Sequence, residues 1–197
     1  SREELEASLG FKFNEHTVMA TYHPVTRGNR SPQEEIDDFL AAIDAFPNLR
    51  VLFTMPNSDQ GGDVIKQSIE HYCALRADRC RSFTSLGMRR YLSALQHVSA
   101  VIGNSSSGLV EVPSVHIPTL NIGDRQKGRP HGLSVLDCGS DYGAIVAGLN
   151  TVLSPAFRHL ARTAANPYEK ANTAQSIFDV IRTYPLEQLN QKSFYNL

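Results

Sequence analysis

Residues 101–129 read VIGNSSSGLVEVPSVHIPTLNIGDRQKGR and contain two short apolar runs, each followed at once by a polar segment. The first run leads into Gly-Asn-Ser-Ser-Ser-Gly, and the second leads into a loop with three cations, Arg125, Lys127 and Arg129. Apolar runs without polar alternation are typical of strands that are covered on both faces, as in a parallel sheet. The stretch therefore predicts a strand, a short helix and a second strand, the repeating unit of an α/β fold.

The same pattern recurs along the chain. Strands are predicted at 17–23, 51–55, 100–104, 118–123 and 134–138. Helices are predicted at 32–46, 63–75, 88–98, 142–153 and 168–183. The first helix has Ser31, Pro32 and Glu34 at its start, a capping box with proline at the first helical position. Strands that alternate with helices predict an open, Rossmann-like parallel sheet with helices on both faces.

The composition is that of one globular domain over residues 1–197, with 41% hydrophobic and 20% charged residues. The net charge of -1 provides no positive field that would attract nucleic acid or an anionic membrane. No apolar run approaches the roughly 20 residues of a membrane-spanning helix. The charged, helix-like start SREELEASLG leads us to expect no secretory signal in this sequence.

The three cysteines, Cys73, Cys80 and Cys138, form no CxxC pair and have no histidine at zinc-ligand spacing. Unpaired cysteines of this kind are typical of a reducing compartment, so the cytoplasm is the expected location. No cluster of carboxylates or histidines has the spacing of metal ligands, and we expect neither a metal nor a cofactor.

Four of the predicted strands end in polar segments. These segments are His23-Pro24, Pro56-Asn57-Ser58-Asp59, Ser105-Ser106-Ser107-Gly108 and the loop at 124–129. In an open α/β sheet, ligands bind beyond the carboxyl ends of the strands. We therefore expect the four segments to converge at one edge of the sheet and to form a ligand site.

Two of these segments are suited to phosphate. Glycines at 103 and 108 allow the backbone to approach a ligand closely, and serine hydroxyls and helix N–H groups are donors for phosphate oxygens. An arginine such as Arg125 can bind a diphosphate through two parallel hydrogen bonds. Alternatively, the serines only cap a helix, and the cations only form a solvated loop.

Three further side chains are candidates on the same basis. Glu111 can accept two hydrogen bonds from a ribose diol, or it can merely complement a helix dipole. His23 is held extended by Pro24 and can donate to a leaving phosphate or carry a proton near neutral pH. Asn57 is a candidate ligand, although a residue of this type also shapes turns.

Together, four segments resemble the hydrolysing UDP-N-acetylglucosamine 2-epimerases. They are TYHPVT (21–26), MPNSDQGG (55–62), VIGNSSSG (101–108) and LNIGDRQKGR (120–129), in the order and with the spacing of that family. The resemblance covers most of residues 16–140. Non-hydrolysing relatives typically carry a Ser-Gly-Gly loop followed by paired glutamates, whereas this chain has Asn-Ser-Ser-Ser-Gly and the single Glu111. The pattern therefore favours the hydrolysing branch.

The resemblance implies two Rossmann-like domains in a GT-B glycosyltransferase arrangement, with the active site between them. Residues 1–197 would be the C-terminal, UDP-binding domain. The tail from about residue 168 to 197 would be helical and would pack towards a missing N-terminal domain. The complete protein would be a homo-oligomer that binds a UDP-sugar, with no nucleic acid or membrane partner.

The resemblance also implies a role for each candidate residue. Ser105 and Ser106 would bind the diphosphate, and Arg125 would pair with its charge. Glu111 would hold the ribose. The remaining assignments are Asn57 in the nucleotide pocket, Leu86 against the uracil, chiefly through its backbone, and His23 as the catalytic residue that contacts phosphate or assists the departure of UDP.

The implied reaction has two stages. A base removes the proton at carbon 2 of the sugar while UDP leaves, and water then adds to the resulting glycal to give N-acetylmannosamine for sialic-acid-type sugars. The residues that handle the carbon 2 proton would belong to the N-terminal domain, so this chain alone would bind UDP weakly and catalyse nothing.

Three alternatives remain open from the sequence. The same reaction could act on a UDP-2,4-diacetamido-trideoxyhexose of the legionaminic type. The chain could instead be the donor domain of a GT-B glycosyltransferase, or a non-catalytic module that binds nucleotide sugars. The sequence does not identify the sugar, because the absent domain would grip most of it.

Overall fold

The computed structural model describes residues 1–25 and 30–185. Residues Ser1–Pro167 form one compact unit, and the chain from Tyr168 onward forms a second, which contains the helix α8 (Thr173–Thr183). The predicted helix at 168–183 therefore begins later than expected. Thr26 and residues 186–197 of the predicted tail lie outside the described residues, and the packing of the tail against another domain stays a prediction.

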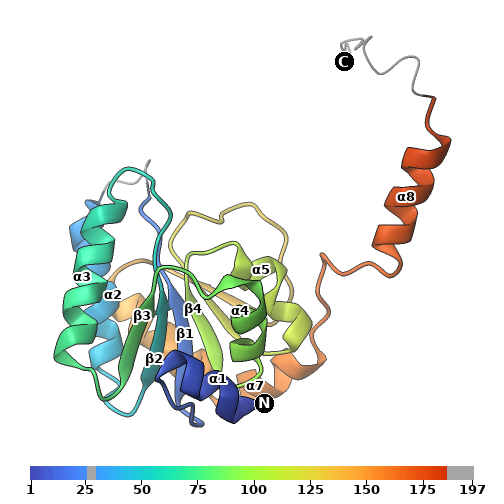
Figure 1. Ribbon diagram of the computed structural model, residues 1–197. Coiled ribbons are helices and arrows are strands. Elements are labelled where there is room, and N and C mark those ends of the chain that lie inside the picture. Colours follow the sequence, from blue (N-terminus) through green and yellow to red (C-terminus); the bar gives the residue numbers. More distant parts are fainter. Residues whose placement is uncertain (26–29, 186–197) are drawn as a thin grey trace. The chain divides into compact units, whose positions relative to one another are not determined.

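The first unit is built on a parallel sheet (Figure 1). Within the described residues, the sheet has six strands in the order β3-β2-β1-β4-β5-β6, and every neighbouring pair is parallel. The strands are β1 (Thr17–Thr21), β2 (Arg50–Thr54), β3 (Cys80–Phe83), β4 (Ala100–Gly103), β5 (Thr119–Ile122) and β6 (Val135–Cys138). The predicted open parallel sheet is confirmed, with one strand, β3, that the sequence analysis did not predict.

The strand order reverses in the middle of the sheet. The strand β1 pairs with β2 on one side, where Thr21 lies opposite Thr54, and with β4 on the other, where Thr21 lies opposite Gly103. The chain builds outward from β1 in both directions, so the loops after β1 and β4 diverge at this point. Ligands of doubly wound sheets bind in the crevice that such a reversal opens.

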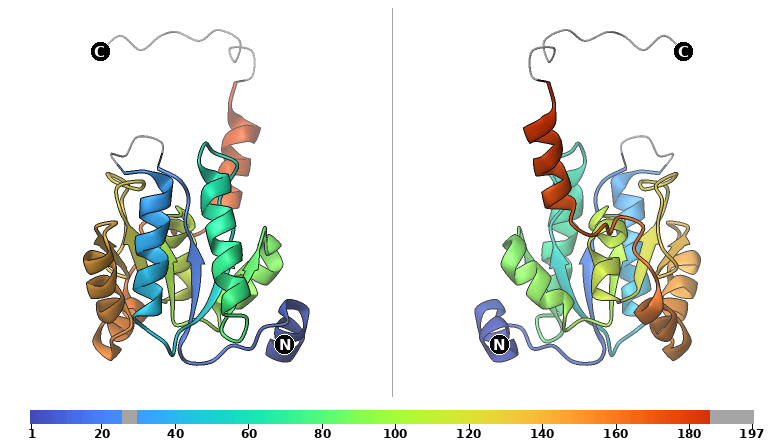
Figure 2. Two further views of the ribbon diagram at one scale, coloured as in Figure 1. Left: turned by 90° about the vertical axis from the view of Figure 1, so that its left-hand side faces the viewer. Right: turned by 90° about the vertical axis from the view of Figure 1, so that its right-hand side faces the viewer.

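Helices cover both faces of the sheet (Figures 1 and 2). The helices are α1 (Arg2–Leu9), α2 (Pro32–Asp44), α3 (Gly62–Leu75), α4 (Gly87–Leu95), α5 (Ser107–Val110), the 3-10 turn η1 (Val112–Val115), α6 (Tyr142–Val152) and α7 (Pro155–Thr163). One hydrophobic cluster joins the sheet to α2, α3 and α6 and includes Phe39, Ile69 and Leu149. A second cluster joins the opposite face to α1 and α4 through Leu5 and Leu95.

The start of α2 confirms the predicted capping box. The Ser31 hydroxyl accepts from the Glu34 N–H at 3.2 Å, and the Glu34 carboxylate accepts from the Ser31 N–H at 2.7 Å. The helix therefore begins at Pro32, as predicted, although it ends at Asp44, two residues before the predicted end. In the part of the chain that the structure describes, no helix is both long enough and apolar enough to cross a membrane.

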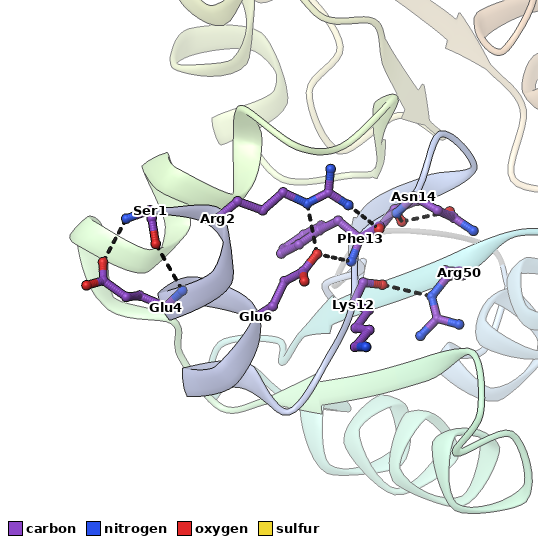
Figure 3. A network of polar contacts seen from close by, with 9 residues as sticks. Ser1, Arg2, Glu4, Glu6, Lys12, Phe13, Asn14 and Arg50 are labelled. Atoms are coloured by element: carbon purple, nitrogen blue, oxygen red, sulfur yellow. Dashed lines mark hydrogen bonds and ion pairs between the residues drawn. The ribbon is translucent and has the colours of Figure 1, made fainter.

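A polar network ties α1 to the segment that enters β1 (Figure 3). The Arg2 guanidinium donates to the Glu6 carboxylate at 2.9 Å and to the Phe13 carbonyl. Glu6 also accepts from the Phe13 N–H at 2.9 Å, and Arg50 donates to the Lys12 carbonyl at 2.9 Å. These bonds hold the segment before β1 in place while the Phe13 ring is buried in the second cluster.

The glycine at the end of β4 has no space for a side chain. Gly103 has φ +130°, and a Cβ on this residue would lie 1.9 Å from the carbonyl oxygen of Thr21. No side chain fits there, because the obstructing atom belongs to the backbone of β1. The absence of a side chain at 103 therefore sets how closely the ends of β1 and β4 meet.

At the opposite end of the sheet, Asp44 accepts hydrogen bonds from three side chains of α3 and the following turn. The donors are the Tyr72 hydroxyl at 2.7 Å, the Arg76 Nε at 2.9 Å and the Arg79 guanidinium. We expect Asp44→Ala to lower the free energy of unfolding by about 1–2 kcal/mol, because it leaves two half-buried cations without their acceptor. Urea unfolding followed by circular dichroism measures the change.

The matched control is Glu70→Ala. Glu70 pairs with Lys66 at 4.0 Å on the surface of α3, and both side chains are about half exposed. Removal of such a pair is expected to change the free energy of unfolding by less than about 0.5 kcal/mol. Equal losses in the two variants would show that the Asp44 network does not stabilise the domain beyond an ordinary surface pair.

Candidate functional site

A pocket of about 500 Å³ lies beyond the carboxyl ends of β1, β2, β3 and β4. Thr21 and Thr54 contribute from the strand ends, and Thr84 and Ser105 contribute from the loops that follow. Four of the predicted site residues line this pocket: His23, Leu86, Ser105 and Glu111. The structure thus brings together residues that lie far apart in the sequence.

His23 stands at one end of the pocket, next to Asn57. The backbone N–H of Asn57 donates to His23 Nδ1 at 3.2 Å, and Asn57 Oδ1 lies 3.1 Å from the same nitrogen. The Asn57 amide is oriented by a 2.7 Å bond from its Nδ2 to the Asp59 carboxylate. Asn57 does not line the pocket itself, but it holds the imidazole that does.

The environment of His23 favours the neutral ring. Burial lowers its pKa, and the charge of Arg125 lowers it further, while Asn57 and Asp59 partly oppose both effects. Because Nδ1 accepts from the Asn57 N–H, the single proton of the neutral ring is on Nε2. In the protonated ring, Nδ1–H can donate to Asn57 Oδ1. Both protonation states therefore have a hydrogen-bond partner on Asn57.

Arg125 reaches the same corner from the loop after β5. Its Nη1 donates to the carbonyl oxygen of Asn104 at 3.2 Å, and partial burial lowers its pKa. Arg125 itself does not line the pocket, and the charge of Arg129 also lowers its pKa. Lys127 and Arg129 line a separate pocket of about 410 Å³ beyond β5 and β6. Of the three cations that the sequence groups together, the structure brings Arg125 to His23.

The serine loop begins at the end of β4. Ser105 lines the pocket, and its Oγ accepts from the Ser107 N–H at 3.4 Å. Ser106 is the N-cap of α5 and is half-buried, but it is not among the residues that line the pocket. Glu111 follows α5 directly, with an exposed carboxylate at the pocket. The short helix that was predicted here is confirmed.

Most of the pocket residues that follow β3 were not predicted from the sequence. Thr84 and Ser85 come from the segment between β3 and α4, and Met88 and Tyr91 come from α4 itself. Burial raises the pKa of Tyr91, so its hydroxyl keeps its proton, and it contacts the Ser107 hydroxyl. Since β3 was not predicted, the residues after it were not seen as a strand end.

Leu86 also lines the pocket, and its position against the uracil stays a prediction. Its side chain is buried in the hydrophobic cluster beneath α4, and its carbonyl oxygen accepts from Arg90 Nε at 2.9 Å. Met88 and Leu92 complete an apolar wall on the same side. The pocket therefore offers hydroxyl groups, the His23 imidazole and the Glu111 carboxylate, together with the apolar side chains of Leu86, Met88 and Leu92.

This combination is that of a Rossmann-like α/β domain with a ligand pocket at the point where its strand order reverses. The sequence matches a protein family described as "UDP-N-acetylglucosamine 2-epimerase" over residues 1–182. The chain belongs to this family.

Individual relatives agree with the family match. Over 199 residues, the chain is 34% identical to "Polysialic acid biosynthesis protein P7" of Escherichia coli. The match covers 100% of this chain and 50% of that protein. Over 137 residues, it is 36% identical to "GDP/UDP-N,N'-diacetylbacillosamine 2-epimerase (hydrolyzing)" of Campylobacter jejuni, covering 70% of this chain and 36% of that protein. The chain spans half or less of the length of these relatives.

Among solved structures, the fold is similar to that of the UDP-GlcNAc 2-epimerase from Neisseria meningitidis bound to UDP-GlcNAc. The TM-score is 0.65 at 13% sequence identity, and the match covers 91% of this chain and 47% of that chain. The Rossmann-like sheet expected for one half of a GT-B-type fold is thereby confirmed.

Proposed function

We propose that this chain is the UDP-binding domain of a hydrolysing UDP-N-acetylglucosamine 2-epimerase. The observation that carries the proposal is the convergence of His23, Ser105 and Glu111 on one pocket, with Arg125 beside His23. The names of the relatives support a nucleotide-sugar substrate, and one of them is named as hydrolysing. The free cysteines are consistent with a cytoplasmic enzyme.

UDP would lie along the pocket with its diphosphate at the His23 end. There His23 Nε2–H, the hydroxyls of Ser105 and Ser106, and Arg125 would donate to phosphate oxygens. The exposed Glu111 carboxylate would accept from the ribose hydroxyls. At the other end, the uracil would lie against the apolar surface that Leu86 begins.

The reaction would proceed by elimination and then hydration. A base, supplied by the missing N-terminal domain, would take the proton from carbon 2, and the electron pair of the bond between carbon 1 and oxygen would leave with UDP. Water would then add its hydroxyl to carbon 1 of the glycal and a proton to the opposite face of carbon 2. The products would be N-acetylmannosamine and UDP.

The contribution of this chain would be to stabilise the charge that develops on the departing diphosphate. The neutral His23 donates from Nε2 without carrying a charge of its own, and Arg125 supplies the positive charge. Such preorganised donors are worth more in a partly desolvated site than in water. As UDP departs, its extra charge would favour the imidazolium, whose Nδ1–H can then donate to Asn57 Oδ1, 3.1 Å away.

The second candidate keeps the reaction and changes the sugar. The C. jejuni relative is named for N,N'-diacetylbacillosamine, a sugar of the 2,4-diacetamido-trideoxyhexose class, and this name favours the alternative. The name of the E. coli relative favours a sialic-acid-type pathway instead. In both cases the UDP-binding residues of this chain would have the same roles.

Two experiments test the proposal. Titration of this chain with UDP, UMP and GDP is expected to give the tightest binding for UDP and no turnover of UDP-N-acetylglucosamine. The complete protein, incubated with each UDP-sugar in D₂O without an acceptor, is expected to release UDP and a 2-epimer that carries one deuterium at carbon 2. Turnover only with an added acceptor would instead identify a glycosyltransferase, and no turnover would identify a binding module.

The protonation of His23 gives a further prediction. The pKa of free His23 lies below its ordinary value of about 6.5, and a bound diphosphate raises it, so binding takes up a proton. UDP affinity should therefore increase as the pH falls through the pKa of the complex and level off below the pKa of the free protein. Isothermal titration at several pH values measures this dependence.

The control for the pH dependence is His23→Gln, which keeps a donor but does not titrate. The terminal phosphate of UDP titrates near pH 6 by itself, at about the value of other phosphate monoesters, and this effect is present in both proteins. The ratio of wild-type to variant affinity isolates His23, and it should rise as the pH falls. A ratio that does not vary with pH contradicts the placement of His23 beside the diphosphate.

A further inference from the structure

We propose that Asn104 is the positioning residue that sets the relative placement of the three loops at the phosphate end of the pocket. This inference rests on the proposed function of the site. Asn104 is fully buried and follows β4 directly. It does not line the pocket, so its effect on a ligand would be exerted through the residues that it holds.

The first loop is held by the side chain of Asn104. Its Oδ1 accepts from the His23 N–H at 2.7 Å, and its Nδ2 donates to the His23 carbonyl at 2.8 Å. The pairing of β1 with β4 ends at Thr21 and Gly103, so the amide continues the hydrogen-bonding pattern where the backbone no longer can. Both backbone polar groups of His23 are thereby engaged, which fixes the residue that carries the imidazole.

The second loop is held by the backbone carbonyl of Asn104. This oxygen accepts from Arg125 Nη1 at 3.2 Å and from Gln126 Nε2 at 2.9 Å. Gln126 is itself buried, so the bond from its amide anchors the loop after β5 beneath its surface. Asn104 therefore positions both the guanidinium of Arg125 and the residue that carries the imidazole, His23.

The third loop begins at Asn104 itself, because Ser105 is the next residue. The Asn104 N–H donates to the Thr21 carbonyl at 3.1 Å, which fixes the point where the serine loop leaves the sheet. The N–H, the C=O and both ends of the side-chain amide are therefore all used. Because the hydrogen bonds of Asn104 go to His23, Arg125, Gln126 and Thr21, its loss should affect diphosphate binding and spare nucleoside binding.

The test compares the affinities of this chain for UDP and uridine, measured by NMR titration. Asn104→Ala is expected to weaken UDP binding by about tenfold, the usual order for misplaced charged donors, with uridine affinity within about twofold of wild type. The ¹⁵N signals of the His23 ring provide a second readout. Wild type should show the Nε2–H form, and the variant should shift towards a mixture of tautomers as the ring loses its fixed orientation.

The matched control is Asn121→Ala. Asn121 is also a buried amide near the end of a strand, β5, and its Nδ2 donates to Asp137 at 2.7 Å, away from His23. This variant should lose stability without any change in the ratio of UDP to uridine affinity. If the ratio changes equally in the Asn104 and Asn121 variants, or in neither, the positioning role of Asn104 is wrong.

If the alanine variant does not fold, the Asn104→Asp variant tests the positioning role instead. This isosteric change keeps the acceptor for the His23 N–H, and burial raises the pKa of the new carboxyl group. Its UDP affinity relative to wild type should be lowest near about pH 8 and should recover towards about pH 5, where the protonated carboxyl regains a donor for the His23 carbonyl. A relative affinity that is constant over this range overturns the inference.

The result for wild type distinguishes a failure of the proposed function from a failure of the role proposed for Asn104. If wild type does not bind UDP, the proposed function fails, and the role of Asn104 fails with it. If wild type binds UDP and the Asn104 variants bind it equally well, only the inference about Asn104 fails.

Discussion

Replacement of Arg125 by alanine is expected to weaken UDP binding by about 10- to 100-fold, because hydrogen bonds to charged groups contribute about 1.5–3 kcal/mol. Arg125 is the cation that the structure places beside His23, and its half-buried position reduces the competition from water. UMP, which lacks the second phosphate, should lose much less affinity. Isothermal titration of the variant with both nucleotides measures the effect.

Lys127→Ala is the control for Arg125. The two residues share one loop, but the Lys127 side chain is 77% exposed and pairs with Asp124 at 3.7 Å. Its removal should leave UDP affinity within about twofold, since exposed pairs contribute little. Arg125→Lys separates charge from shape, because lysine keeps the charge without the planar fork. Wild-type affinity for UDP in Arg125→Ala would refute the assignment of this residue to the diphosphate.

Gly103→Ala is expected to lower the free energy of unfolding by more than about 3 kcal/mol, or to prevent folding. The added Cβ would lie 1.9 Å from the Thr21 carbonyl oxygen, and a φ of +130° is strained for any residue with a side chain. The ends of β1 and β4 would have to separate to accommodate it. Thermal and urea unfolding measure the loss, and the yield of soluble protein reports a failure to fold.

Gly128→Ala is the matched control, because it isolates the backbone strain from the clash. Gly128 has φ +82°, but no heavy atom lies within 4 Å of a Cβ built there. The expected loss is therefore only about 1 kcal/mol, the usual cost of a left-handed conformation for a residue with a side chain. Similar losses at 103 and 128 would mean that the Thr21 carbonyl does not obstruct a side chain at 103.

The parts of the fold that could be predicted are those that depend on local pattern. The apolar runs of β1, β2, β4 and β5 have no polar alternation because both faces of each strand are covered, and the capping box at Ser31 marks the start of α2. The edge strand β3 was not predicted, because it lacks such a continuous apolar run. Its sequence, Cys-Arg-Ser-Phe, carries polar residues at positions that an edge strand leaves partly exposed.

The candidate site also has parts that could be predicted from the sequence and parts that could not. His23, Ser105, Glu111 and Arg125 could be proposed because each follows a predicted strand, and the carboxyl ends of parallel strands meet at one edge. That Arg125 lies beside His23, whereas Lys127 lies in another pocket, depends on how the loop after β5 folds back, which no local pattern encodes. The functional roles of all of these residues stay predictions until binding is measured.

The positioning of His23 by Asn104 could not be predicted for a related reason. It depends on the register between β1 and β4 and on the absence of a side chain at 103, both of which are properties of two strands together. Tyr91 was placed within a predicted helix, but its approach to Ser107 depends on how α4 packs against the sheet.

The two ends of the pocket differ in how freely their residues can be replaced. Thr84, Ser85 and Met88 are exposed and follow the edge strand β3, so substitutions there cost little folding stability. The opposite end depends on Gly103 and Asn104, which are buried in the packing of the central strands. Under the proposed function, single surface changes after β3 would alter the contacts to the nucleobase at little cost in stability, whereas changes at Gly103 or Asn104 would also disturb the packing of the central strands.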